Sequence, residues 1–248
     1  MSASFYLYGI IDGGDPPRTV AAGIGEPPSP VLVRPFTGFG LVYSEVDADG
    51  YTFSVSDVRA HQAVLEGLMS ERTVLPFTFG TVAAGAAALE ELATQAGADV
   101  SERLEQLRGR VEVGLKVFWI REAMRQAIGV PPPQRAGSAP ADRYGTAIRV
   151  GQAVEEQARR WRDEYVPQMT AALAPLYDEM AEGQIVAPTM LWNASFLIAR
   201  GRQPAFGAAV ADLNRRFGHH LDFRHAGPFP PYSFVHLRIG PTREEGAP

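Results

Sequence analysis

The stretch that decides the last part of the fold is Gly227-Pro228-Phe229-Pro230-Pro231-Tyr232-Ser233-Phe234-Val235-His236-Leu237-Arg238-Ile239-Gly240. Proline fixes φ and has no backbone N–H, so residues 228–231 predict a stiff, extended lead-in. After the prolines, Ser233, Val235, Leu237 and Ile239 alternate with Tyr232, Phe234, His236 and Arg238. This period of two predicts a closing strand over residues 232–239, with the prolines at the start of the strand or on a sheet edge.

Outward from this stretch, the chain reads as a mixture of strands and helices. Alternation and enrichment in aromatic and β-branched residues predict further strands at residues 5–11, 31–33, 40–44, 51–55, 74–81, 111–119 and 190–199. Apolar residues at spacings of three and four predict helices at residues 57–71, 86–95, 99–108, 121–128, 147–182 and 204–217. Ser56 is expected to cap the first helix, whose buried stripe is read as Val58, His61, Leu65 and Leu68.

The order of these elements predicts an α+β fold of two domains, each a sheet with helices on one face. The boundary is placed at residue 109, giving domains 1–108 and 109–248. After it, the order strand, helix, strand, helix, strand approaches a split βαβ unit, so the C-terminal domain is expected to be ferredoxin-like. The strand at 111–119 could belong to either sheet. The proline- and glycine-rich segment 130–141 is expected to be a loop that folding does not require.

Composition limits the function classes. The chain has 248 residues and a net charge of −5, which does not favour a general attraction to nucleic acid. It has no cysteine, which excludes disulfides, thiolate metal sites and a cysteine nucleophile. Its first residues lack the positive charge of a secretory signal, and no apolar run approaches the ~18 residues of a membrane span. These features are typical of a cytoplasmic protein.

A search for catalytic and ligand-binding patterns finds little. The only lysine, Lys116, follows Leu115, so no phosphate-binding Gly-Lys-Ser/Thr is present. Gly23-Ile24-Gly25 begins a dinucleotide-like pattern, but the prolines after it prevent a helix. His61 is read as a core residue, and a metal site of His219, His220 and His225 lacks a fourth ligand with suggestive spacing. We therefore expect no catalytic residue, no cofactor and no metal.

Four segments of the sequence, in the same order along the chain, resemble segments of a known family. Tyr6-Leu7-Tyr8-Gly9-Ile10, Val74-Leu75-Pro76-Phe77-Thr78-Phe79-Gly80-Thr81, Asn193-Ala194-Ser195-Phe196-Leu197-Ile198 and the Gly227–Phe234 stretch are similar to segments of the gas vesicle F/L family. Two departures are Phe229, where the family has tryptophan, and Thr78, where it often has arginine. The resemblance implies structural or interface roles for Tyr8, Gly9, Pro76, Phe79, Gly80, Gly227, Pro228, Phe229, Pro230, Pro231, Tyr232, Ser233 and Phe234.

The resemblance implies a role in assembly. Members of this family are accessory or minor components of gas vesicles, needed for assembly of the shell. The implied partner is the small, hydrophobic shell protein (GvpA-type), with other gas vesicle accessory proteins as further partners, and neither nucleic acid nor membrane. The implied location is the cytoplasm, at the gas vesicle, and the F and L types both remain open. The rival reading is a small-molecule or haem enzyme on a ferredoxin-like scaffold, with His61 or His219 as its candidate residue.

Overall fold

The computed structural model describes residues 4–15, 21–47, 52–130 and 140–235. These residues form two separate sheets with helices, so the expected α+β class is confirmed. The chain divides into two compact units, residues 1–111 with 229–248, and residues 112–228. The predicted second domain includes the chain from Phe229 onward, whereas this segment belongs with the first unit.

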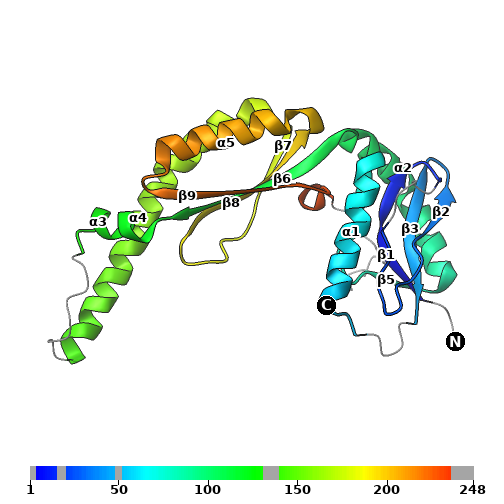
Figure 1. The fold of residues 1–248 in the computed structure, drawn as a ribbon, viewed down its shortest axis with the longest axis horizontal. Helices are drawn as coiled ribbons and strands as arrows, with labels where there is room; N and C mark the ends of the chain where they lie inside the picture. Colours follow the sequence, from blue (N-terminus) through cyan, green and yellow to red (C-terminus); the bar gives the residue numbers. More distant parts are fainter. Residues whose placement is uncertain (1–3, 16–20, 48–51, 131–139, 236–248) are drawn as a thin grey trace, which may run out of the picture. The chain divides into compact units, whose positions relative to one another are not determined.

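The sheet of the first unit is built around its first strand (Figure 1). Its strand order is β2-β3-β1-β4, and β5 also pairs with β1. Every residue of β1 from Phe5 to Ile11 is buried. Because successive residues of a strand point to opposite faces, both faces of β1 are covered. The strands are β1 (Ser4–Asp12), β2 (Leu32–Phe36), β3 (Phe39–Val46), β4 (Val74–Pro76) and β5 (Val82–Ala84).

Helix α1 (Val55–Glu71) begins two residues earlier than expected. Ser54, not Ser56, is its N-cap, and Asp57 completes a capping box by accepting from the Ser54 backbone N–H at 2.8 Å. The expected strand at 51–55 is wrong, since residues 52–54 lead directly into this cap and Tyr51 lies outside the described residues. The buried face also differs, because Asp57 is buried while Val58 is 47% exposed.

Two other expectations for the first unit are corrected. The segment 74–81 is not one strand, because a turn with Gly80 at φ +86° separates β4 from β5. The two helices expected at 86–95 and 99–108 are one, α2 (Gly85–Leu107). Asp99 is an interior residue of α2, so its capping-box spacing did not mark a helix start.

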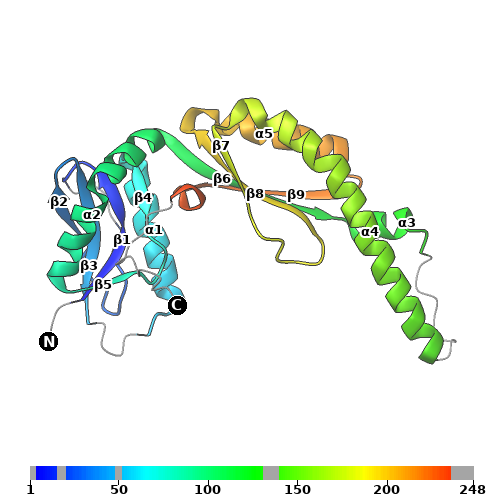
Figure 2. The ribbon, with the colours of Figure 1, turned by 180° about the vertical axis from the view of Figure 1, so that it is seen from behind.

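The second unit has the β-α-β-β-α-β order of a ferredoxin-like fold. Its sheet order is β7-β8-β6-β9, and Figures 1 and 2 show α4 and α5 on the same face of it. The elements are β6 (Arg110–Trp119), α3 (Arg121–Ala127), α4 (Pro140–Leu173), β7 (Glu179–Glu182), β8 (Met190–Ala199), α5 (Gln203–Phe217) and β9 (Leu221–Phe229). Between the sheet and these helices lie Leu115 of β6, Phe196 of β8 and Phe206 of α5, all fully buried.

The helix expected over 147–182 is too long at its C-terminal end. Helix α4 ends at Leu173, where Pro175 follows in a short 3₁₀ turn, and residues 179–182 form β7, which the sequence analysis missed. Pro175 ends the helix because it has no N–H and its ring clashes with the preceding turn. Pro167, in contrast, lies inside α4. The loop expected at 130–141 falls mostly on residues 131–139, which lie outside the described residues.

The closing strand lies earlier than predicted. It is β9, which ends at Phe229, and Tyr232–Phe234 form a 3₁₀ turn instead of a strand. The two prolines between them, Pro230 and Pro231, have no N–H to continue a ladder, and their carbonyls accept from the turn instead, as in Tyr232 N–H to Pro230 O at 2.8 Å. Residues 236–239 of the predicted strand lie outside the described residues.

Candidate functional site

The first unit contains a cluster of aromatic rings around a buried histidine. Tyr6 and Tyr8 of β1 are two residues apart and therefore share a face of the sheet. His61 of α1 packs against both, with ring centroids 5.7 Å from each, and Phe79 lies at the same distance from His61. Phe53, which precedes the cap of α1, lies 5.2 Å from Phe79. We call these five residues the aromatic cluster.

Burial determines the protonation state of the histidine. The Tyr6 hydroxyl lies 2.8 Å from His61 Nδ1 and accepts from the Gly80 N–H at 3.3 Å. Which of these two atoms donates depends on the imidazole tautomer, because a phenolic hydroxyl can donate one hydrogen bond and also accept. Burial lowers the pKa of His61 to about 4, and the Phe77 carbonyl opposes this shift to a smaller extent. His61 is thus neutral at pH 7 and only 2% exposed, as the core reading predicted.

The second tyrosine of the cluster anchors a loop. The Tyr8 hydroxyl accepts from the Ile24 N–H at 2.9 Å and lies 3.0 Å from Ser44 Oγ. Burial raises the pKa of Tyr8. A Cβ on Gly23 would come within 2.5 Å of this hydroxyl, so the loop can approach only with glycine there. The glycines at 23–25 therefore have a packing role.

The structure brings several of the family-typical residues together. Gly9 pairs with Pro76 across β1 and β4, and the Phe77 N–H donates to the Tyr8 carbonyl at 2.9 Å. Phe79 belongs to the aromatic cluster, and Gly80 bonds to it through Tyr6. The segments 6–10 and 74–81, which are distant in sequence, thus pack against each other in the first unit.

The closing residues divide between the units. Gly227 and Pro228 belong to the second unit, and the residues from Phe229 belong to the first. Pro230, Pro231 and Phe234 are buried, whereas Tyr232 and Ser233 are half-buried. Arg103 of α2 donates from Nε to the Phe234 carbonyl at 3.1 Å. Burial raises the pKa of Tyr6, and the neighbouring hydroxyls of Tyr8 and Tyr232 add to that shift, which places Tyr232 near the aromatic cluster.

The other histidines belong to the second unit, apart from His236, which lies outside the described residues. His220 stacks on Trp161 at 4.7 Å, and its Nδ1 lies 2.7 Å from the Tyr165 hydroxyl. His225 lies against Phe206 of α5, with ring centroids 5.5 Å apart. Among the described residues, no group of three or more histidine, aspartate or glutamate side chains is arranged to hold a metal ion.

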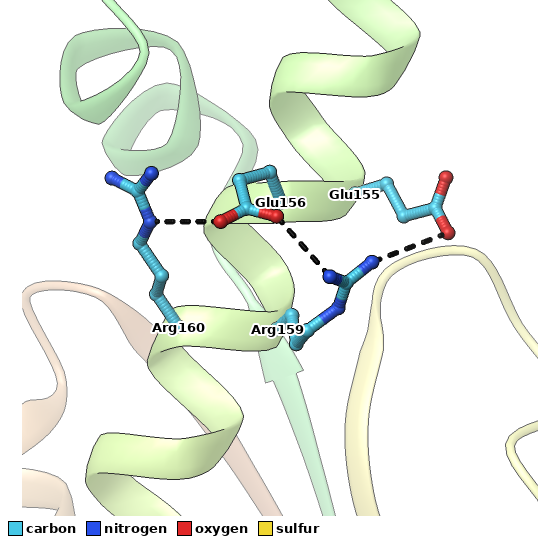
Figure 3. A network of polar contacts seen from close by, with 4 residues as sticks. All are labelled: Glu155, Glu156, Arg159 and Arg160. Atoms are coloured by element: carbon cyan, nitrogen blue, oxygen red, sulfur yellow. Dashed lines mark hydrogen bonds and ion pairs between the residues drawn. The ribbon is translucent and has the colours of Figure 1, made fainter.

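Two glutamates and two arginines pair on one face of α4 (Figure 3). Glu156 bonds to Arg160 at 3.2 Å and to Arg159 at 3.3 Å, and Glu155 lies 4.0 Å from Arg159. Two carboxylates thus offset two guanidinium groups on an exposed helix face. Such exposed pairs contribute little to stability, ~0.3–0.5 kcal/mol each.

Sequence reasoning missed the exposed valines at the start of α1. Val55 is 71% exposed and Val58 is 47% exposed, although Val58 was assigned to the buried stripe. The signal that identifies the correct face is the capping box of Ser54 and Asp57, which fixes the first turn and places Asp57 inward.

The comparisons with known proteins agree with this architecture. The family described as "Gas vesicle synthesis protein GvpL/GvpF" matches residues 4–236. Gas vesicle protein F of a Nostoc species is 28% identical, covering 96% of this chain and all of that protein. Gas vesicle protein F of a Streptomyces species is 31% identical, covering 94% and 99%.

Solved structures show the same fold. The crystal structure of the gas vesicle protein GvpF from an Anabaena species superposes with a TM-score of 0.78 at 26% identity, covering 96% of this chain and all of that one. GvpF from Microcystis aeruginosa gives 0.76 at 27% identity, covering 94% and 99%. Within the described part of the chain, every helix is too short or too polar to span a membrane. The chain belongs to the gas vesicle GvpL/GvpF family, and this membership supports an accessory role in gas vesicles.

Proposed function

We propose that this chain captures the small, hydrophobic shell-forming subunit during gas vesicle assembly, in the cytoplasm at the growing vesicle. The observation that carries the proposal is the family match over residues 4–236. A shell subunit with one apolar face would aggregate before assembly, because large exposed apolar surfaces associate. A partner that covers this face would keep the subunit available for nucleation or growth, and the chain would act as a chaperone-like minor component.

The charge distribution suits such a partner. The first unit has 9 basic and 16 acidic residues, a net charge of −7, whereas the second has 14 basic and 12 acidic residues, a net charge of +2. Net charge on a carrier opposes self-association of its complexes. Because charge of this kind acts at long range and is screened by salt, it would keep the complex dispersed while apolar contacts supply the binding.

The closing segment supports the binding surface in this proposal. Its buried Pro230, Pro231 and Phe234 pack into the first unit, and Tyr232 lies near the aromatic cluster. Tyr232→Ala and Phe229→Ala, made singly, separate two roles for the segment. Loss of capture with the fold intact would make it part of the interface, and loss of the fold would make it scaffold alone.

The direct test is co-expression of this chain, tagged, with the shell-forming subunit, followed by purification through the tag. We expect the two proteins to elute together in a soluble complex, and the shell subunit expressed alone to be insoluble. A tagged unrelated protein of similar size and charge serves as the control. If the shell subunit is no more soluble with this chain than with the control, the proposal is wrong.

A further inference from the structure

The start of α1 presents apolar side chains to solvent beside the aromatic cluster. Val55 and Val58 are three residues apart on the helix, so their side chains lie on the same face. They are 71% and 47% exposed. Phe53, two residues before Val55, is half-buried and contacts Phe79, which is also half-buried. We call Phe53, Val55, Val58 and Phe79 the α1 patch.

The start of helix α1 requires some of these apolar residues but not all of them. Phe53 precedes the N-cap and Val58 is the fourth helical residue, and apolar residues at these two positions commonly staple a helix start. Val55 is the first helical residue and has no such role. Valine is also a weaker helix former than most residues, so an exposed valine in the first turn does not stabilise α1.

The two chain segments that form the patch carry few charged side chains. Among residues 52–60 and 78–81, all of them described, Arg59 is the only exposed charged side chain, because Asp57 is buried. The remaining polar neighbours are hydroxyl residues, namely Thr52, Ser54, Ser56, Thr78 and Thr81. A neutral patch within a unit of net charge −7 is suited to an apolar partner surface and not to a charged one.

We propose that the α1 patch is the surface that contacts the apolar face of the shell-forming subunit. This inference rests on the function proposed above and adds the location of the contact. Phe79 belongs both to the α1 patch and to the segment 74–81, which resembles the family. Aromatic and aliphatic side chains on a capped, rigid turn bind with little loss of conformational entropy.

The chain offers a matched control for testing the patch. Ile185 and Val186, in the β7–β8 connection of the second unit, are 47% and 70% exposed, nearly the same fractions as Val58 and Val55. The Val55→Ser/Val58→Ser and Ile185→Ser/Val186→Ser variants therefore remove similar exposed apolar area at two places. Val55→Ser alone is a third variant, which keeps the staple residue Val58 if the double variant folds poorly.

Capture of the co-expressed shell subunit is compared for the three variants and the unmutated chain, with circular dichroism to verify folding. We expect Val55→Ser/Val58→Ser to reduce the captured amount at least about tenfold, Val55→Ser to reduce it severalfold, and Ile185→Ser/Val186→Ser to change it less than about twofold. Full capture by the Val55 variants, or equal loss in the control pair, would overturn the patch and leave the proposed function standing.

Two further outcomes are distinguishable. If the unmutated chain captures nothing, the proposed function itself fails, whatever the variants do. If the unmutated chain forms a concentration-dependent dimer in sedimentation and Val55→Ser/Val58→Ser abolishes it, the patch joins two copies of this chain. That result would also overturn the proposal.

Discussion

The histidine of the aromatic cluster should make the stability of the first unit depend on pH. His61 has an ordinary pKa of 6.5 when unfolded and about 4 in the folded chain, because burial disfavours its charged form. As the pH falls below about 6.5, the unfolded chain takes up the proton first, so the free energy of unfolding decreases until the pH reaches about 4. The shift corresponds to about 3 kcal/mol in total, of which about 2 kcal/mol is lost by pH 5.

The perturbation that isolates this effect is His61→Gln. Glutamine does not titrate, yet its side-chain amide can hydrogen-bond with the Tyr6 hydroxyl in place of Nδ1. Carboxylates also titrate as the pH falls, so the quantity to compare is the stability lost between about pH 7 and pH 5 in each protein. We expect that loss to be smaller by about 2 kcal/mol in the variant. His219→Gln, on an exposed residue, controls for the substitution itself.

Urea unfolding followed by far-ultraviolet circular dichroism measures the change. All three tryptophans, at 119, 161 and 192, lie in the second unit, so their fluorescence follows that unit separately. The pH-dependent difference between the proteins should appear in the circular dichroism transition and be absent from the fluorescence transition. Equal losses of stability in the unmutated chain and in His61→Gln would refute the buried, neutral histidine.

Two further predictions concern the closing segment. Gly227 has φ +132°, and a Cβ there would lie 3.0 Å from the Glu112 carbonyl oxygen, so Gly227→Ala should lower the free energy of unfolding by about 2 kcal/mol. Gly114→Ala in the same sheet, whose Cβ would meet only the Ala226 carbonyl at 4.0 Å, should stay within about 1 kcal/mol, and similar losses in both would count against the strain argument. Arg103→Ala removes the donors to the Phe234 carbonyl and should cost about 1–2 kcal/mol in urea unfolding. Arg108→Ala, which removes only an exposed pair with Glu105 on α2, should cost almost nothing, and no difference between the two arginines would contradict the anchoring of the closing segment.

The sequence predicted elements where one period dominates. Strict alternation from Val111 to Trp119 identified β6, and the run at 190–199 identified β8, because their buried faces leave a clear pattern. The α+β class and the ferredoxin-like order followed from these strands and the helices between them. The missed strand β7 has four residues, Glu-Met-Ala-Glu, which individually favour helix, so only its pairing with β8 makes it a strand.

The prediction for the closing segment failed for a different reason. Residues 232–239 alternate like a strand, yet residues 232–234 form a turn, because the two prolines before them remove the donors that a ladder needs. The segments that resemble the family identified Phe79 and Tyr232 as residues of interest. The association of Phe79 with the cluster could not be read from spacing, because it depends on ring contacts with Tyr6 of β1 and His61 of α1. The exposure of Val55 likewise depends on the cap at Ser54.

Capture of the gas vesicle shell subunit by the purified chain, at low and at high salt, distinguishes apolar binding from binding by charge. At ~1 M salt the Debye length is about 3 Å, so attraction between exposed charges is largely screened, whereas apolar contacts persist. We expect the captured amount to be at least as large at high salt as at low salt. Capture that is lost at high salt would contradict the apolar mechanism, and no capture at either salt concentration would contradict the proposed function.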